Sequence, residues 1–183
     1  MGTSPEPGRR ESDAPADPVE RARAICLRML TGTPRTRGQL EEALRRREIP
    51  EDAAAAVLDR FEEVGLIDDA AFAAAWVDSR HHGRGLAGRA LARELRQRGV
   101  AAPVVAEAVA GLDPEREEET ARALVERKLR ATRGLERDRR LRRLAGMLAR
   151  KGYPEGLALR VVREALEREG EEVEEWELPP SGG

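Results

Sequence analysis

The chain has 183 residues, of which 37% are charged and only 3% are aromatic. Burial must therefore rest on Leu, Val, Ile and Ala, and a hydrophobic content of 40% is too high for a wholly disordered chain. A single cysteine, Cys26, excludes an internal disulfide and a multi-cysteine zinc site. Because no apolar run approaches the ~18–20 residues of a membrane helix, and the first residues lack the apolar stretch of a secretory signal, we expect a cytoplasmic protein.

The net charge of −2 conceals an uneven distribution of charge along the chain. Residues 1–18 carry −2 and residues 171–183 carry −5, which leaves +5 on residues 19–170. Two stretches are especially basic: residues 80–98 have six arginines against one acid, and residues 121–151 have twelve bases against three acids. This pattern favours an acidic or polyanionic partner. The alternative is that the arginines are simply solvated helix surface.

The ends and the body differ in pattern. Residues 1–17 and 171–183 combine Pro, Gly, Ser and charge without periodicity, and we expect both to be disordered tails. Between them, no run of β-branched and aromatic residues alternates with the period of a strand. Apolar residues recur instead at steps of three and four, as on one face of a helix. The sequence therefore predicts an all-α fold.

Start and stop signals divide this body into about nine helices. Asp17-Pro18, Thr36, Asp68 and Asp113-Pro114 can cap helix beginnings, and glycines stand where left-handed helix ends are favoured. In chain order the predicted helices cover residues 18–31, 36–47, 50–64, 68–81, 87–98, 101–111, 114–132, 136–151 and 154–169.

An internal repeat organises these helices. Leucines four residues apart precede a tight turn three times, at offsets of 51 and 53 residues: Leu40 and Leu44, Leu91 and Leu95, and Leu144 and Leu148. The predicted domains are three three-helix repeats over residues 18–66, 67–112 and 113–170. A unit of this size with few aromatics is marginal alone, so the repeats should pack in series. We expect an elongated, curved stack without a deep central pocket.

No group of residues forms a catalytic or metal-binding pattern. His81 and His82 are adjacent and so do not share a helix face, and the Gly-rich stretch that follows lacks a phosphate-binding lysine motif. Cys26 lies in an apolar run, which favours packing over reactivity. Phe72 and Trp76 are interpreted as core anchors, with stacking on nucleic-acid bases as the alternative. We therefore expect a protein that is not an enzyme and uses no metal or cofactor.

Specific motifs of the chain resemble the RecX family of bacterial regulators. The stretch GLIDDAAFAAAWVDSR (65–80), followed by a Gly-rich turn and LARELRQRGV (91–100), is similar to the signature of that family. The resemblance covers residues 19–168. Glu48 departs from it, because the other two repeats, and usually the family, have glycine at this turn. If the turn requires a positive φ, glutamate strains it by ~1 kcal/mol.

The resemblance implies three tandem three-helix repeats and a function. Members of the RecX family bind the RecA recombinase and modulate it, commonly by inhibiting ATP hydrolysis and strand exchange, in recombination, DNA repair and the SOS response. They are thought to lie in the groove of the RecA–DNA filament, and they are not enzymes and need no cofactor. We expect this chain to be a monomer whose partner is the RecA filament, with single- or double-stranded DNA within it as a further contact.

The basic faces of the second and third repeats are the candidate site for the filament. The ten candidates are Arg84, Arg89, Arg93, Arg96, Arg133, Arg137, Arg139, Arg140, Arg142 and Arg143. Arginine suits both carboxylates and phosphates, because its planar group donates paired hydrogen bonds. The alternative function is a helical module that binds DNA directly without RecA. No predicted helix displays the cluster of Asn, Gln and Arg typical of base recognition.

Overall fold

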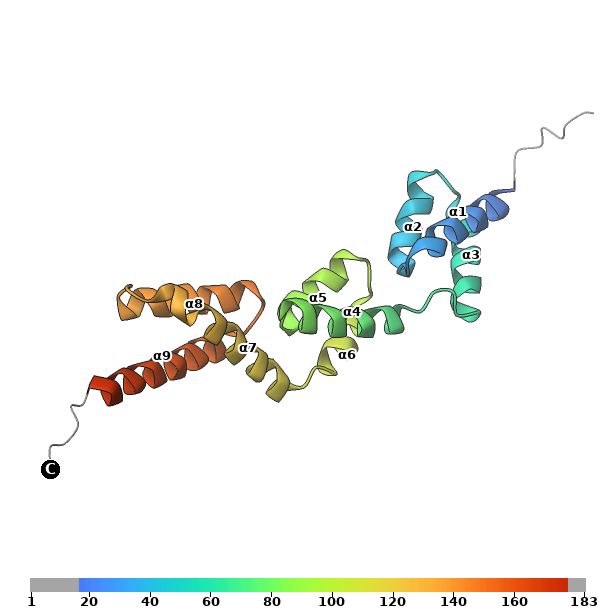
Figure 1. Cartoon of the computed structure of the whole chain (residues 1–183). Coiled ribbons are helices and arrows are strands. Elements are labelled where there is room, and N and C mark those ends of the chain that lie inside the picture. Colours follow the sequence, from blue (N-terminus) through green and yellow to red (C-terminus); the bar gives the residue numbers. More distant parts are fainter. Residues whose placement is uncertain (1–16, 178–183) are drawn as a thin grey trace, which may run out of the picture. The chain divides into compact units, whose positions relative to one another are not determined.

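The structure is a computed structural model that describes residues 17–177, with side chains described for residues 17–170. Helices are the sole regular elements of this part of the chain, and no strand occurs in it (Figure 1). In chain order they are α1 (Pro18–Gly32), α2 (Arg37–Arg46), α3 (Glu51–Glu63), α4 (Asp69–Arg84), α5 (Gly88–Gln97), α6 (Ala102–Ala110), α7 (Pro114–Leu129), the short 3-10 helix η1 (Arg130–Thr132), α8 (Arg137–Arg150) and α9 (Glu155–Glu177). The prediction of an all-α fold is confirmed.

Helix boundaries differ from the predicted ones by more than one residue in three places. The helix predicted for residues 114–132 divides into α7 and η1, and α4 continues three residues beyond the predicted end at 81, to Arg84. The third difference concerns the C-terminal tail predicted for residues 171–183, because α9 continues through its first part to Glu177. Glutamate, which dominates that part, is a good helix former. The predicted tail at 1–17 lies outside the described residues except for Asp17.

Side-chain caps begin three of the helices as the sequence predicts. The Asp17 carboxylate accepts the N–H of Val19 at 3.1 Å, and that of Asp113 accepts the N–H of Glu115 at 3.0 Å. At α4, the Asp68 carboxylate accepts the N–H of Ala71 at 2.9 Å. Each cap satisfies a backbone donor that has no partner within its helix. These local bonds fix where the helices start.

The three tight turns of the repeat share one backbone geometry. The N–H three residues past the end of each helix bonds back to the carbonyl of the second leucine of the pair, from Ile49 to Leu44, from Val100 to Leu95 and from Tyr153 to Leu148, at 3.1 to 3.2 Å. The preceding residue has positive φ in every case: 56° at Glu48, 79° at Gly99 and 93° at Gly152. This is the hydrogen-bond pattern of a Schellman ending. The sequence repeat is therefore a structural repeat, and Glu48 adopts the strained conformation.

Three apolar cores correspond to the three groups of helices. The first is built by α1, α2 and α3 around Leu40, Leu44 and Phe61, and it includes Ile67. The second is built by α4, α5 and α6, and the third by α7, α8 and α9. Of the described residues, 17–35 and 39–67 form one compact unit, and 36–38 with 68–177 form another. The predicted stacking of all three repeats stays a prediction.

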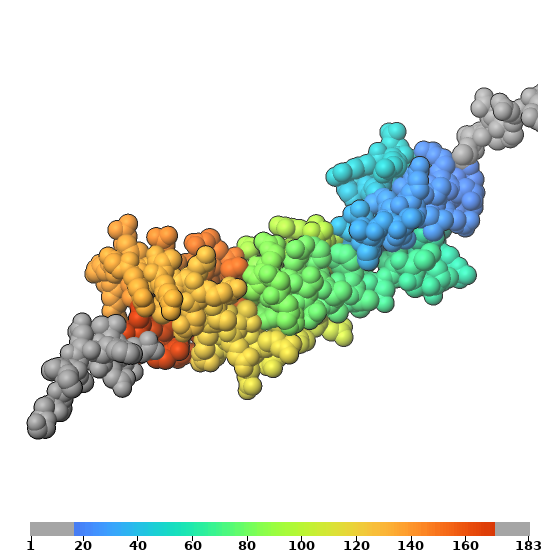
Figure 2. Space-filling model, viewed as in Figure 1, coloured from blue at the N-terminus to red at the C-terminus, as the bar shows by residue number. Residues whose placement is uncertain are grey.

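Within the second unit, specific hydrogen bonds join the second and third bundles, whose atoms form a continuous surface in Figure 2. The Ala87 N–H donates to the Lys151 carbonyl at 2.9 Å, and the Tyr153 hydroxyl donates to the Gly85 carbonyl at 2.9 Å. His81 is buried here, with Nδ1 2.9 Å from the Leu86 carbonyl and Nε2 3.1 Å from the Thr120 hydroxyl. His81 therefore has a structural role at this junction.

Candidate basic interaction surface

Helix α5 presents three of the predicted arginines as a single row. Arg89, Arg93 and Arg96 are spaced four and three residues apart and are exposed, while Leu91 and Leu95 on the opposite side are fully buried. Among the described residues, none of the three arginines has an ion-pair partner. Burial of the leucine face thus orients an uncompensated cationic face toward solvent.

Helix α8 carries a similar row. Arg139, Arg142 and Arg143 are exposed and have no ion-pair partner in the described part of the chain. Leu144 and Leu148 lie on the opposite, buried side of the helix. Helices α5 and α8 occupy the same place in the repeat, since both precede a turn of the same geometry. At the repeat offset of 53 residues, Arg142 corresponds to Arg89, while Arg139 and Arg143 correspond to the buried Leu86 and Ala90, so the two rows share one position and otherwise differ.

Helix α8 ends where α5 begins. The bond from Ala87 to the Lys151 carbonyl links the residue after α8 to the residue before α5. A Cβ added to Gly152 would lie 2.5 Å from the backbone nitrogen of Ala90, so the two backbones touch. Figure 1 shows the two helices one after the other. Six of the predicted arginines therefore lie on two helices that follow one another in space, three on each helix.

The other four predicted residues have acidic partners within the chain. Arg84 lies 3.3 Å from Glu94, Arg133 lies 2.8 Å from Glu169 and Arg137 lies 3.6 Å from Glu167. All three arginine side chains are more than half exposed, so their pairs are weak. They contribute less free positive charge to the surface than the two rows.

Arg140 differs from the rest because its side chain is only 14% exposed. It donates to Glu169 at 2.5 Å, to the Thr132 hydroxyl at 3.0 Å and to the Leu129 carbonyl at 3.2 Å. Burial acts to raise the pKa of Glu169, but hydrogen bonds from Arg133 and Arg140 outweigh it, so this pKa is lowered. Arg140 therefore holds α7, η1, α8 and α9 together and is not part of the exposed basic surface.

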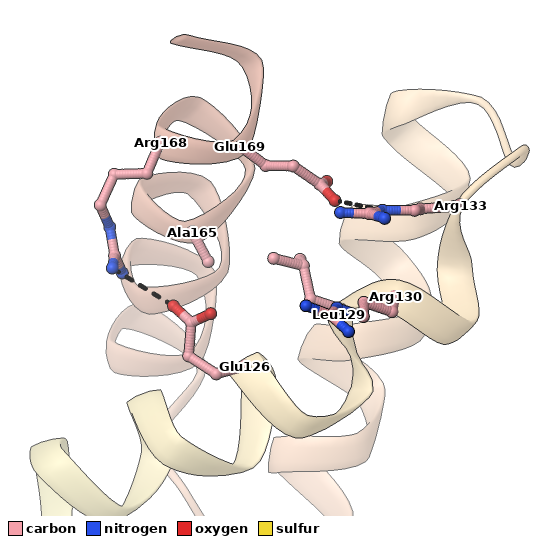
Figure 3. Close-up of a pocket in the computed structure, with 7 residues that line it drawn as sticks. All are labelled: Glu126, Leu129, Arg130, Arg133, Ala165, Arg168 and Glu169. Carbon is pink, nitrogen blue, oxygen red and sulfur yellow. Dashed lines mark hydrogen bonds and ion pairs between the residues drawn. The ribbon is translucent and has the colours of Figure 1, made fainter. Parts of the chain in front are cut away.

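A hollow of about 140 Å³ lies beside this network, between α7 and α9 (Figure 3). Glu169 reaches Arg133 across it, and Arg168 reaches Glu126 at 3.2 Å. Because charges of both signs line this hollow and pair with one another, it offers little net charge to a ligand.

Four cations near the junction of α8 and α5 are absent from the predicted site. Arg150 continues the α8 row, seven residues beyond Arg143. Arg127, Lys128 and Lys151 gather with Arg84 around another hollow. Helical periodicity could have added Arg150, whereas the gathering of α4, α7 and α8 depends on tertiary packing.

The cysteine and the aromatic residues that were candidates for reactivity or base stacking lie in environments that favour a role in packing. Burial raises the pKa of the Cys26 thiol to about 11, so the reactive thiolate is scarce at neutral pH. Arg80 and Arg98 lie over the Trp76 ring at 4.2 and 3.8 Å, and Phe72 stacks on it at 5.8 Å, which disfavours the base-stacking alternative. No group of three metal-ligating side chains occurs among the described residues. Within the same part of the chain, no helix could span a membrane.

Comparison with protein families identifies all three bundles. Models for the first, second and third three-helix domains of RecX match residues 22–61, 68–109 and 115–162. The chain belongs to the RecX family. It is 75% identical to the Regulatory protein RecX of Streptomyces coelicolor over 90% of this chain and 87% of that protein. It is 66% identical to that of Thermobifida fusca over 89% of this chain and 88% of that protein.

Solved RecX structures share the fold. The crystal structure of RecX from Lactobacillus salivarius superposes with a TM-score of 0.74 at 20% identity, over 82% of this chain and 97% of that one. A second structure, of a regulatory protein RecX, gives 0.72 at 24% identity, over 81% of this chain and 73% of that one. The prediction of three three-helix repeats is confirmed by the three family models, while the residue bounds given to the repeats stay a prediction.

Proposed function

We propose that this RecX family member binds RecA or the RecA–DNA filament and inhibits its ATPase and strand-exchange activities in recombination, DNA repair and the SOS response. It acts in the cytoplasm as a monomer that uses no cofactor and catalyses no reaction. Membership of the family supports this proposal, as do close relatives named as regulatory proteins.

The arginine rows on α5 and α8 carry the proposal. Six exposed arginines without acidic partners, on equivalent helices that follow one another, form a cationic track over two successive repeats. A filament offers the same acidic or phosphate groups at regular intervals, so each repeat can make a similar contact. Linked contacts bind together more strongly than each does alone, because the second forms at high effective concentration. A protein bound in this way would resist rearrangement of the filament.

Charge reversal on α8 tests this assignment. The variant Arg139→Glu with Arg142→Glu and Arg143→Glu should lose most of the inhibition of the DNA-dependent ATPase of the cognate RecA. We expect at least a tenfold higher concentration for half-inhibition, since each reversed arginine replaces an attraction with a repulsion. The measurement is ATP hydrolysis and strand exchange with substoichiometric amounts of the protein.

A matched control distinguishes the effect of the α8 row on inhibition from the effect of total charge. Arg21, Arg28 and Arg163 are also exposed arginines without ion-pair partners in the described chain, but they lie on α1 and α9. Their combined change to glutamate gives the same net charge and should leave inhibition nearly intact. Equal inhibition by wild type and the α8 variant, with helical content unchanged, would show that the row is not the site.

Direct binding to DNA is the second candidate, because the same unpaired arginines suit phosphates. Titration of single-stranded DNA with and without RecA at several salt concentrations distinguishes the two. Binding that needs RecA favours the regulator. Binding to bare DNA that RecA does not strengthen, with a slope of log affinity against log salt of about −0.7 per neutralised phosphate, favours the module.

A further inference from the structure

A second cationic feature lies beside the α8 row, at the junction of the two bundles in the second unit. It is a hollow of about 400 Å³ formed where the C-terminal ends of α4 and α8 meet α7. Its lining comprises Gly83, Arg84, Leu124, Arg127, Lys128, Met147 and Lys151. Four of these residues are cations and none is an acid.

Acidic side chains of the described residues do little to neutralise the cations around this hollow. Arg127 and Lys128 are exposed and have no ion-pair partner in the part of the chain that the structure describes. The Lys151 ammonium donates to the Arg84 carbonyl at 2.8 Å, which fixes its position without neutralising its charge. Arg84 has a single acidic contact, to Glu94 at 3.3 Å, and Glu94 does not line the hollow.

The same packing keeps the positive charges together at an electrostatic cost. Burial lowers the pKa of Lys151, and the positive charges of Arg84, Arg127 and Lys128 lower it further. Like charges held close to one another repel, whereas an anion among them turns each repulsion into an attraction. This contrasts with the hollow of Figure 3, where two glutamates pair with two of the three arginines.

The shape and surroundings of the hollow indicate a polymer rather than a small free anion. Leu124 and Met147 provide an apolar part of the lining, which suits a sugar attached to a phosphate. Arg143 and Arg139 precede Met147 by four and eight residues, so they lie toward the same side of α8 as the hollow, whereas Arg142 lies on the far side. The stretch from residue 139 to 151 is about 18 Å long at ~1.5 Å per residue. Phosphates along one strand of a stacked nucleic acid recur every ~3.4 Å, so this stretch can contact several of them.

We propose that Arg84, Arg127, Lys128 and Lys151 form a binding site for a phosphodiester of a nucleic-acid strand whose neighbouring phosphates follow Arg143 and Arg139 along α8. The site exists because the second and third bundles are joined, since its lining comes from α4 of the second bundle and from α7 and α8 of the third. It goes beyond the proposed inhibition of RecA, because it predicts a contact that this chain makes with nucleic acid by itself.

The test measures binding of a fluorescent single-stranded oligonucleotide by anisotropy, without RecA. The variant Arg127→Glu with Lys128→Glu should weaken binding at least tenfold at low salt. It should also make the salt dependence shallower by about 1.4, at ~0.7 for each lost phosphate contact. The control is Arg116→Glu with Arg163→Glu, two exposed arginines on α7 and α9 that have no ion-pair partner in the described chain. It should bind nearly as the wild type does.

Methyl NMR locates the contact directly. Met147 lines the hollow, while Met29 packs against the core of the first bundle and serves as an internal reference. In protein labelled at the methionine methyl groups, the oligonucleotide should shift the Met147 signal and not that of Met29. Inorganic phosphate, at the same phosphate concentration, should shift Met147 much less.

Three results would overturn the proposal. They are equal weakening by the variant and its control, an unshifted Met147 signal in protein that has bound the oligonucleotide, and an equal shift of that signal by inorganic phosphate. Since RecA is absent from both measurements, their failure leaves the proposed inhibition of RecA untouched. Loss of ATPase inhibition in the α8 variant likewise leaves the Met147 result untouched.

Discussion

At the scale of single residues, Glu169 decides which arginines remain available to a partner. Its side chain is only 11% exposed and contacts Arg140 at 2.5 Å and Arg133 at 2.8 Å. Arg139 and Arg143, on the same helix as Arg140, face solvent. In sequence the three arginines are alike. The ion pair with Glu169 on α9, which is distant along the chain, gives Arg140 a structural role.

We predict that Glu169→Gln destabilises the protein by about 2 kcal/mol, because hydrogen bonds to a charged group are lost from a nearly buried site. The control is Glu167→Gln, whose exposed pair with Arg137 at 3.6 Å should contribute less than ~1 kcal/mol. Unfolding by urea at pH 7 measures both. Similar losses for the two variants would contradict a structural role for Glu169.

The lowered pKa of Glu169 predicts how this difference varies with pH. A carboxyl group whose pKa is lower in the folded state stabilises the protein above its ordinary pKa near 4.5, and that contribution is lost as the pH falls through the folded value. The stability gap between wild type and Glu169→Gln should therefore be largest at neutral pH and close in acid. Unfolding curves across this range check it, and a constant gap would contradict it.

At the scale of elements, the same turn geometry occurs three times, but the residue with positive φ is glycine in two of the turns and glutamate in the first. Gly99 and Gly152 take a positive φ at no steric cost, while Glu48 takes φ of 56° with a side chain. The hydrogen bond from Ile49 to Leu44 and the burial of Ile49 hold the turn in place. Tertiary packing therefore overrides the local preference of glutamate.

We predict that Glu48→Gly stabilises the first unit by about 1 kcal/mol, since glycine removes the strain of positive φ. The neighbouring Arg47, whose φ is not positive, provides the control: Arg47→Gly should not stabilise. Thermal unfolding followed by circular dichroism measures both. A Glu48→Gly variant no more stable than the wild type would mean that the turn carries no strain.

At the scale of the second unit, the junction of the second and third bundles brings the end of α8 against the start of α5 and forms the cationic hollow. The contact between Gly152 and Ala90 leaves no room for a side chain, because an added Cβ would lie 2.5 Å from the Ala90 nitrogen. Tyr153 adds a buried hydroxyl bonded to the Gly85 carbonyl. Both features occur at the third turn of the repeat, so the turn that ends α8 also holds the third bundle against the second.

We predict that Gly152→Ala destabilises the protein by about 2–4 kcal/mol, because alanine meets both a positive φ and a backbone clash. Gly134 is a matched control, since it has φ of 87° but no atom within 4 Å of an added Cβ. Gly134→Ala should cost only ~1 kcal/mol. Equal costs, measured by urea unfolding, would show that the contact at Ala90 does not hold the bundles together.

The sequence alone determined the local features of the fold. Caps such as Asp68, the leucine pairs of the repeat and the apolar spacing of three and four residues all act within a few turns of helix, so they can be read without tertiary information. The same spacing places Arg89, Arg93 and Arg96 opposite the buried leucines of α5. The exposure of this row follows from helical periodicity and burial.

Tertiary structure decided which charges are free. Arg140 pairs with Glu169, 29 residues away, whereas Lys151 donates to the backbone carbonyl of Arg84, 67 residues away, and keeps its charge. No local pattern encodes such pairings, because they depend on how α9 packs on α8 and how the second and third bundles join. The sequence could therefore predict that these helices are basic, but only packing distinguishes an arginine that stabilises the fold from one left free for a partner.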